Sequence, residues 1–173
     1  MIDPFKKMLV YLDGSEDSVS AAMAAIALAK RLDATLTAIY VVNTRALKDL
    51  VKARIFLDSE ELEYRRDIEG DAKRYLRHVK ELGAQKGVEV IPVKTSGTVH
   101  TEVRNYLQEN HIDLLVLGGI SEIHSRRDEL LSETDRMMRT APCPVLVVRD
   151  NDAVWEMFET LPNVKPEAAH DTY

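Results

Sequence analysis

The stretch from Asp113 to Val148, DLLVLGGISEIHSRRDELLSETDRMMRTAPCPVLVV, decides the fold that this sequence predicts. It opens with a short apolar run closed by Gly118-Gly119, and it ends with a second apolar run, Pro144–Val148. Such runs, bounded by turn residues, are typical of strands buried on both faces. The segment between them has helical spacing, with an apolar stripe made by Leu130, Leu131, Thr134, Met137, Met138 and Ala141. Strand, glycine turn, helix and strand form a right-handed βαβ unit, whose first loop is a common anion site.

The rest of the chain repeats this alternation of strands and helices. The predicted strands are Met8–Leu12, Thr35–Val42 and Val88–Lys94, the last of them ended by Thr95-Ser96-Gly97. Ser15 is placed to cap a helix that runs to about Leu32. We predict a five-stranded parallel, doubly wound α/β sheet of the Rossmann-like kind, with helices on both faces.

Two further helices follow from apolar spacing. One has Ile68, Ala72, Tyr75, Val79 and Leu82 on one face and is expected to end at Gly83 as a C′ residue. The other, shorter helix turns Val99, Val103, Tyr106 and Leu107 inward. Residues 45–63 also read as polar and helical, but their apolar side chains share no single face, and we interpret the segment as a mobile or partner-contacting excursion that leads into the long helix.

Composition limits the function. The 173 residues are enough for one domain with a real core, and 45% of them are hydrophobic. Lys and Arg number 23 against 29 Asp and Glu, and no segment gathers basic residues, so nucleic acid is not expected as a partner. The single cysteine, Cys143, cannot form an internal disulfide and is expected to pack as a small hydrophobe. No apolar leader or run of 18 apolar residues occurs, so we expect no membrane association and a cytoplasmic location.

The composition changes after Val148. Val154, Trp155, Phe158 and Leu161 make one short apolar face in an acidic extension, and residues 162–173 are expected to be disordered. We expect the apolar face to dock, either on a partner subunit or over the cleft beside Gly118. The alternative is a floating tail with a solvated tryptophan.

Four segments together resemble the universal stress protein (UspA-like) family. They are the strand end Asp13-Gly14-Ser15, the strand end Tyr40-Val41-Val42, the strand DLLVLG and the closing APCPVLVV. The resemblance covers roughly residues 5 to 149, so we predict a family domain over 1–149 and an extension over 150–173. It implies an adenine nucleotide alpha hydrolase-like fold and a cytoplasmic homodimer paired through the last strand, Val145 to Val148. In one branch of the family it also implies a bound ATP or AMP.

The nucleotide-binding branch of the family carries the motif G-x2-G-x9-G-[ST], whose glycines let backbone N–H groups close on phosphates. In this sequence its four positions hold Gly118, Ser121, Leu131 and Ser132, so two of the three glycines are replaced. Glu133 places a carboxylate in the first turn of the helix, where it would compete with a phosphate for the positive end of the helix dipole.

Asp13 and Val41 correspond to the family's adenine-side positions. Each also has an ordinary structural role, since Asp13 can bond the turn that follows it. We expect a degenerate site, with no cofactor or with ATP or AMP and Mg²⁺.

No catalytic or metal site is predicted. Gly-x-Ser-x-Gly, Walker A and H-x-x-E-H patterns do not occur, and the five histidines lack metal-ligand spacing. A response-regulator receiver would need an acidic pair after the first strand and an aspartate after the third, and both are missing. The favoured function is a non-catalytic stress-response dimer that acts as a signalling or adaptor module toward an unknown protein partner. The alternative is an ATP- or AMP-binding switch, and nothing in the sequence supports an enzyme.

Overall fold

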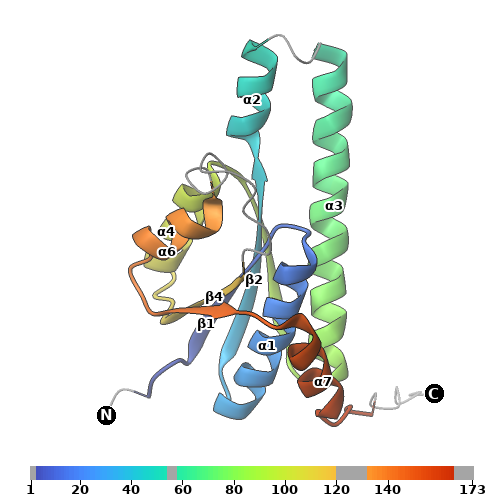
Figure 1. Ribbon diagram of the computed structural model, residues 1–173, viewed down its shortest axis with the longest axis vertical. Helices are drawn as coiled ribbons and strands as arrows, with labels where there is room; N and C mark the ends of the chain where they lie inside the picture. Colours follow the sequence, from blue (N-terminus) through green and yellow to red (C-terminus); the bar gives the residue numbers. More distant parts are fainter. Residues whose placement is uncertain (1–2, 54–57, 120–131, 166–173) are drawn as a thin grey trace, which may run out of the picture.

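The computed structural model describes residues 3–53, 58–119 and 132–165 and is built on a five-stranded sheet (Figure 1). The strands lie in the order β3-β2-β1-β4-β5, and each neighbouring pair is parallel. Their bounds are β1 Lys7–Leu12, β2 Thr35–Asn43, β3 Val90–Gly97, β4 Leu114–Gly118 and β5 Val145–Val148. The predicted parallel, doubly wound sheet is therefore confirmed, and β5 lies at an edge.

Helices cover both faces of the sheet. α1 (Glu16–Leu32) and α3 (Asp58–Gln85) lie on one face, and α4 (Val99–Glu109) and α6 (Glu133–Thr140) lie on the other (Figure 1). The chain moves outward from β1 to β3 and then returns to β4, so right-handed crossovers change face at that point. Two apolar clusters result, and β1 contributes alternately to both: Met8, Val10 and Leu12 to one, Leu9 and Tyr11 to the other.

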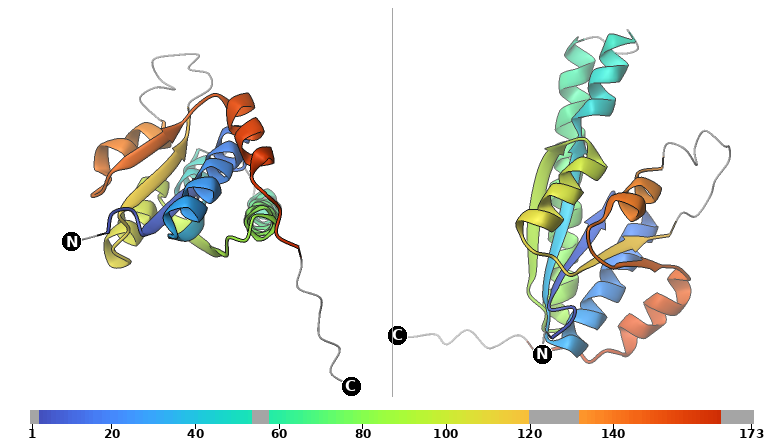
Figure 2. Two further views of the ribbon diagram at one scale, coloured as in Figure 1. Left: turned by 90° about the horizontal axis from the view of Figure 1, so that it is seen from below. Right: turned by 90° about the vertical axis from the view of Figure 1, so that its left-hand side faces the viewer.

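The segment after β2 forms a helical arm. β2 leads directly into α2 (Thr44–Lys52), and α2 and the first half of α3 project beyond the sheet (Figures 1 and 2). Leu47 is buried in this arm, whereas Leu62 and Tyr64 are exposed. The excursion predicted for residues 45–63 is thus largely helical, apart from residues 54–57, which lie outside the described residues.

Three predicted boundaries are wrong. α3 runs through Gly83 to Gln85 because Gly83 is buried against β3, where a Cβ would lie 2.5 Å from Val90 Cγ2. The left-handed residue after this helix is Gly87, with φ of 77°. β3 begins at Val90, and the residues expected to end it, Thr95-Ser96-Gly97, pair with β2 inside the strand.

The C-terminal extension packs on its own domain. α7 (Asn151–Thr160) lies beside α1 (Figure 2), and Val154 and Phe158 are buried there in the same cluster as residues of α1. The apolar face docks as predicted, but it docks on α1 of its own domain and not on a partner or over the cleft, and Trp155 itself is 56% exposed. Residues 162–165, expected to be disordered, are held by the domain, since Val164 N–H donates to the Gln85 carbonyl at 2.8 Å. None of the helices among the described residues is long and apolar enough to span a membrane.

Candidate functional site

The sheet brings three of the predicted site residues to one edge. Asp13 follows β1, Val41 lies near the end of β2, and Gly118 ends β4, which are three adjacent strands. Parallel strands share one carboxyl edge, where α/β folds bind ligands. Ser132 begins α6 after the loop that follows β4. Ser121 and Leu131 lie outside the described residues.

Asp13 is used by its own turn. One oxygen of its carboxylate, Oδ1, accepts hydrogen bonds from Ser15 N–H at 2.9 Å and from the Ser15 hydroxyl at 2.5 Å. Ser15 Oγ in turn accepts from Ser18 N–H at 3.1 Å, which is the predicted N-cap of α1. Asp13 therefore has the structural role expected for it, which is to hold the turn that follows β1.

Gly118 is required by packing. A Cβ at this position would lie 2.6 Å from the backbone carbonyl carbon and oxygen of Asp17 and 2.9 Å from Ser18 N. The first turn of α1 therefore approaches β4 so closely that only glycine fits. The neighbouring Gly119 is less restricted, since its Cβ would meet an Arg149 side-chain carbon and the Val148 oxygen at 3.2 Å.

Val41 is buried on the face covered by α4 and α6. Its register partner on β3 is Thr95, whose hydroxyl oxygen is buried and has no hydrogen-bond partner in the part of the chain described. A threonine in a strand is ordinary, so no sequence signal could have singled out this residue.

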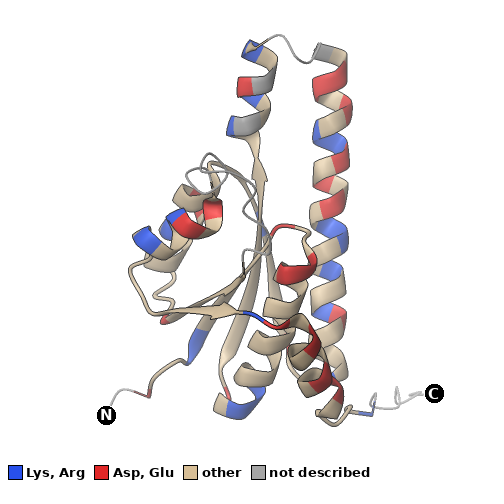
Figure 3. Ribbon diagram, viewed as in Figure 1, with Lys and Arg blue, Asp and Glu red and all other residues tan. Residues whose placement is uncertain are grey.

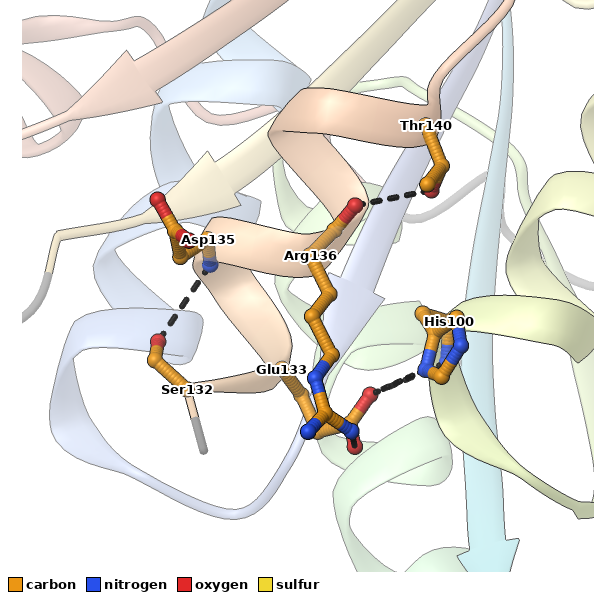
Figure 4. Close-up of polar contacts among 6 residues, drawn as sticks. All are labelled: His100, Ser132, Glu133, Asp135, Arg136 and Thr140. Atoms are coloured by element: carbon orange, nitrogen blue, oxygen red, sulfur yellow. Dashed lines mark hydrogen bonds and ion pairs between the residues drawn. The ribbon is translucent and has the colours of Figure 1, made fainter. Parts of the chain in front are cut away.

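Glu133 joins the N-termini of two helices (Figure 4). Its Oε2 accepts a hydrogen bond from His100 N–H in the first turn of α4 at 3.1 Å and lies 3.0 Å from His100 Nδ1. Its Oε1 lies 3.5 Å from Arg136 of the same helix. Ser132 Oγ caps α6 by accepting from Asp135 N–H at 3.3 Å. A carboxylate of the protein therefore sits where two helix dipoles favour an anion.

Sequence reasoning missed His100 because the contact depends on how α4 and α6 pack. The histidine lies 33 residues before Glu133. Its place in the first turn of a predicted helix was the only available signal.

Carboxylates make this edge electronegative. Burial raises the pKa of the Tyr11 hydroxyl, and the charges of Asp13 and Glu133 raise it further. Burial also raises the pKa of Tyr40, with additional contributions from Asp71 and Asp13. Figure 3 shows acidic residues at the start of α1, and these include Glu16 and Asp17. A polyphosphate bound at this edge would lie close to these carboxylates, and like charges repel.

Metal ligands do not gather in the described ranges, where no group of three His, Cys, Asp or Glu side chains could hold an ion. A recess of about 380 Å³ lies at the other edge of the sheet, lined partly by Lys30, Asp33, Val88 and Ile91. It contains none of the predicted site residues.

Comparison with known proteins gives consistent matches. The model for the "Universal stress protein family" matches residues 4–149. Universal stress protein YxiE of Bacillus subtilis is 33% identical over 153 residues, which cover 84% of this chain and 99% of that protein.

Two solved structures share the fold. Universal stress protein UspA from Lactobacillus plantarum has a TM-score of 0.68 and 27% identity, covering 84% of this chain and 99% of that chain. A universal stress protein from Arabidopsis thaliana with AMP bound has a TM-score of 0.62, covering 86% of this chain and 94% of that chain. At 14% identity, the Arabidopsis structure shows a shared fold only.

Proposed function

The chain belongs to the universal stress protein family, and from that membership we propose that it acts as a non-catalytic homodimeric module of the stress response. In this proposal it signals through contacts with another protein and not through chemistry on a substrate. Its location in this proposal is the cytoplasm.

The observation that carries the proposal is the position of Glu133. The family's nucleotide motif opens α6 with a residue pair whose N–H groups would face a phosphate. In this chain the Glu133 carboxylate stands at that helix start and is held there by the backbone and ring of His100. A phosphate entering the same place would meet a fixed negative charge, which disfavours nucleotide binding.

The edge position of β5 supports the homodimer. Leu146 on this strand is 39% exposed, and β5 pairs only with β4 among the described residues. An apolar edge strand invites pairing with another chain. A symmetric pairing of two identical edges closes at two subunits.

Mass spectrometry of the purified protein under native conditions tests both parts, since it reports subunit number and any retained nucleotide. We expect a dimer whose mass equals twice that of the chain. A monomer would contradict the proposed dimer. A mass increment of one nucleotide per subunit would contradict the proposal that the Glu133 carboxylate disfavours nucleotide binding.

A second candidate function is an ATP- or AMP-binding switch with Mg²⁺. It is favoured by the capped start of α6 at Ser132 and by the fold shared with a relative that has AMP bound. Titration calorimetry with ATP and AMP, with and without Mg²⁺, separates the two functions. We expect the natural chain to bind nucleotide more weakly than micromolar. Glu133→Gln should raise the nucleotide affinity by at least about tenfold, because removal of the like charge restores about 1.4 kcal/mol or more. Tight binding by the natural chain would favour the switch.

A further inference from the structure

Lys86 lies at the junction of α3 and β3 and is only 3% exposed. Its ammonium donates to the Leu161 carbonyl and to Asn163 Oδ1, each at 2.8 Å. It also lies 4.7 Å from the centre of the Phe158 ring, which is a cation–π distance. An ammonium has three donors, and all three contacts come from the C-terminal extension. No ion pair to Lys86 occurs in the part of the chain that the structure describes.

The extension is fitted to the domain along its length. Val154 and Phe158 are its two buried apolar side chains in α7, and they lie in the same cluster as α1. Beyond α7, Val164 N–H donates to the Gln85 carbonyl, and a Cβ on Gly87 would lie 2.7 Å from Val164 Cγ2. The end of the extension therefore lies directly on the α3–β3 junction.

The start of the extension reaches the candidate site. Asp150, with φ of 63°, reverses the chain after β5 and caps α7 by accepting from Ala153 N–H at 3.1 Å. Asn151 Nδ2 then donates to Asp17 Oδ1 at 2.8 Å. The backbone of Asp17 is the group that presses against Gly118. A single hydrogen bond, from Asn151 to Asp17, thus connects the extension to the Asp13–Ser18 turn at the carboxyl edge of the sheet.

We propose that residues 150–165 form a releasable strap, which is latched by Lys86 at one end and connected through Asn151 and Asp17 to the candidate site at the other. The latch suits release because the ammonium contacts of Lys86 that hold it are to the strap and are replaced by water when the strap leaves. Release exposes Val154 and Phe158 of α7, the partly buried Leu161 and the part of α1 that α7 covers, which is a small share of the apolar cluster. Anything that captures the strap then alters the Asp13–Ser18 turn, and a ligand at that turn alters strap docking to the same degree.

Hydrogen–deuterium exchange of the full chain tests this proposal, with Lys86→Met as the principal variant. Methionine keeps the apolar stem and removes the ammonium. We expect the amides of residues 158–161 and of Val164 to exchange at least about tenfold faster, since local opening free energy sets the exchange rate. Amides of residues 13–18 should accelerate as well. Lys30→Met is the matched control, because Lys30 donates to the Lys86 carbonyl at 2.7 Å and, among the described residues, makes no hydrogen bond or ion pair to the strap.

The outcomes are separable from the proposed function because amide exchange requires neither a nucleotide nor a protein partner. Unchanged exchange of the strap in Lys86→Met would overturn the latch. A faster strap with an unchanged Asp13–Ser18 turn would overturn the connection to the site. Asn151→Ala should accelerate exchange in the Asp13–Ser18 turn while the amides of Leu161 and Val164 stay protected. The milder Asn163→Ala tests the latch if Lys86→Met folds poorly.

Discussion

Gly118 shows at the scale of one residue how packing and ligand binding can require the same amino acid. Its missing Cβ makes room for the backbone of Asp17 and Ser18, so a glycine is needed here whether or not a nucleotide binds. We expect Gly118→Ala to destabilise the protein by about 1–3 kcal/mol, because backbone cannot move aside as a flexible side chain can. Thermal unfolding should show a decrease of roughly 2–4 °C per kcal/mol for a chain of this size.

Gly119→Ala is the control for this prediction. Its Cβ would meet the Val148 oxygen and a flexible Arg149 side chain at 3.2 Å, so a smaller change is expected. Equal melting temperatures for Gly118→Ala and the natural chain, measured without nucleotide, would show that the glycine is not a packing requirement.

Tyr11 gives a prediction for alkaline pH. Burial raises the pKa of its hydroxyl, and the carboxylates of Asp13 and Glu133 add to this effect. Because the folded pKa lies above the unfolded value of about 10, the stabilisation is complete below about pH 10 and is lost as pH rises beyond it. Tyr11→Phe should therefore flatten the decrease in unfolding free energy between about pH 9 and pH 11, measured by urea denaturation. Some slope should remain, since burial also raises the pKa of Tyr40, and an unchanged slope would contradict the assignment to Tyr11.

At the scale of helices and strands, local patterns predict the elements better than their ends. The apolar runs at β1, β2, β4 and β5 and the cap at Ser15 follow from neighbouring residues, and the structure contains all of them. The end of α3 does not, because Gly83 is determined by contact with β3 and not by its place in the helix. The Glu133–His100 contact and the place where α7 docks likewise depend on tertiary packing, so periodicity could not predict them.

The two glycines of α3 make a matched test within one helix. Gly70 faces open space, with nothing within 4 Å of its would-be Cβ, whereas a Cβ on Gly83 would lie 2.6 Å from the Val88 oxygen. Gly70→Ala should raise the unfolding free energy by about 0.5–1 kcal/mol, since alanine loses less backbone entropy in a helix. Gly83→Ala should lower it by about 1–3 kcal/mol through overlap with the backbone of Val88 and the side chain of Val90. Chemical denaturation measures both, and the same sign for the two variants would contradict the packing described for α3.

At the scale of the whole molecule, the two edges of the sheet differ in how readily they could pair with a strand of another subunit. The edge at β5 carries the half-exposed Leu146 and has no partner strand beyond it among the described residues. β3, at the other edge, carries Pro92 and Lys94, and proline and lysine on an edge strand discourage strand pairing. If the chain dimerises through a sheet edge, β5 is therefore the edge that the structure favours.

Leu146→Lys tests this assembly directly. The residue is 39% exposed, so a lysine can be accommodated in the single subunit, but two symmetric copies of it would place like charges in one seam. We expect light scattering at micromolar concentration to report a dimer for the natural chain and a shift toward monomer for the variant. Leu62→Lys, at a 52% exposed leucine on α3 in the arm, is the control and should leave the dimer intact. A natural chain that is monomeric would rule out the dimer, whereas a dimer weakened by Leu62→Lys and not by Leu146→Lys would move the interface from β5 to the helical arm.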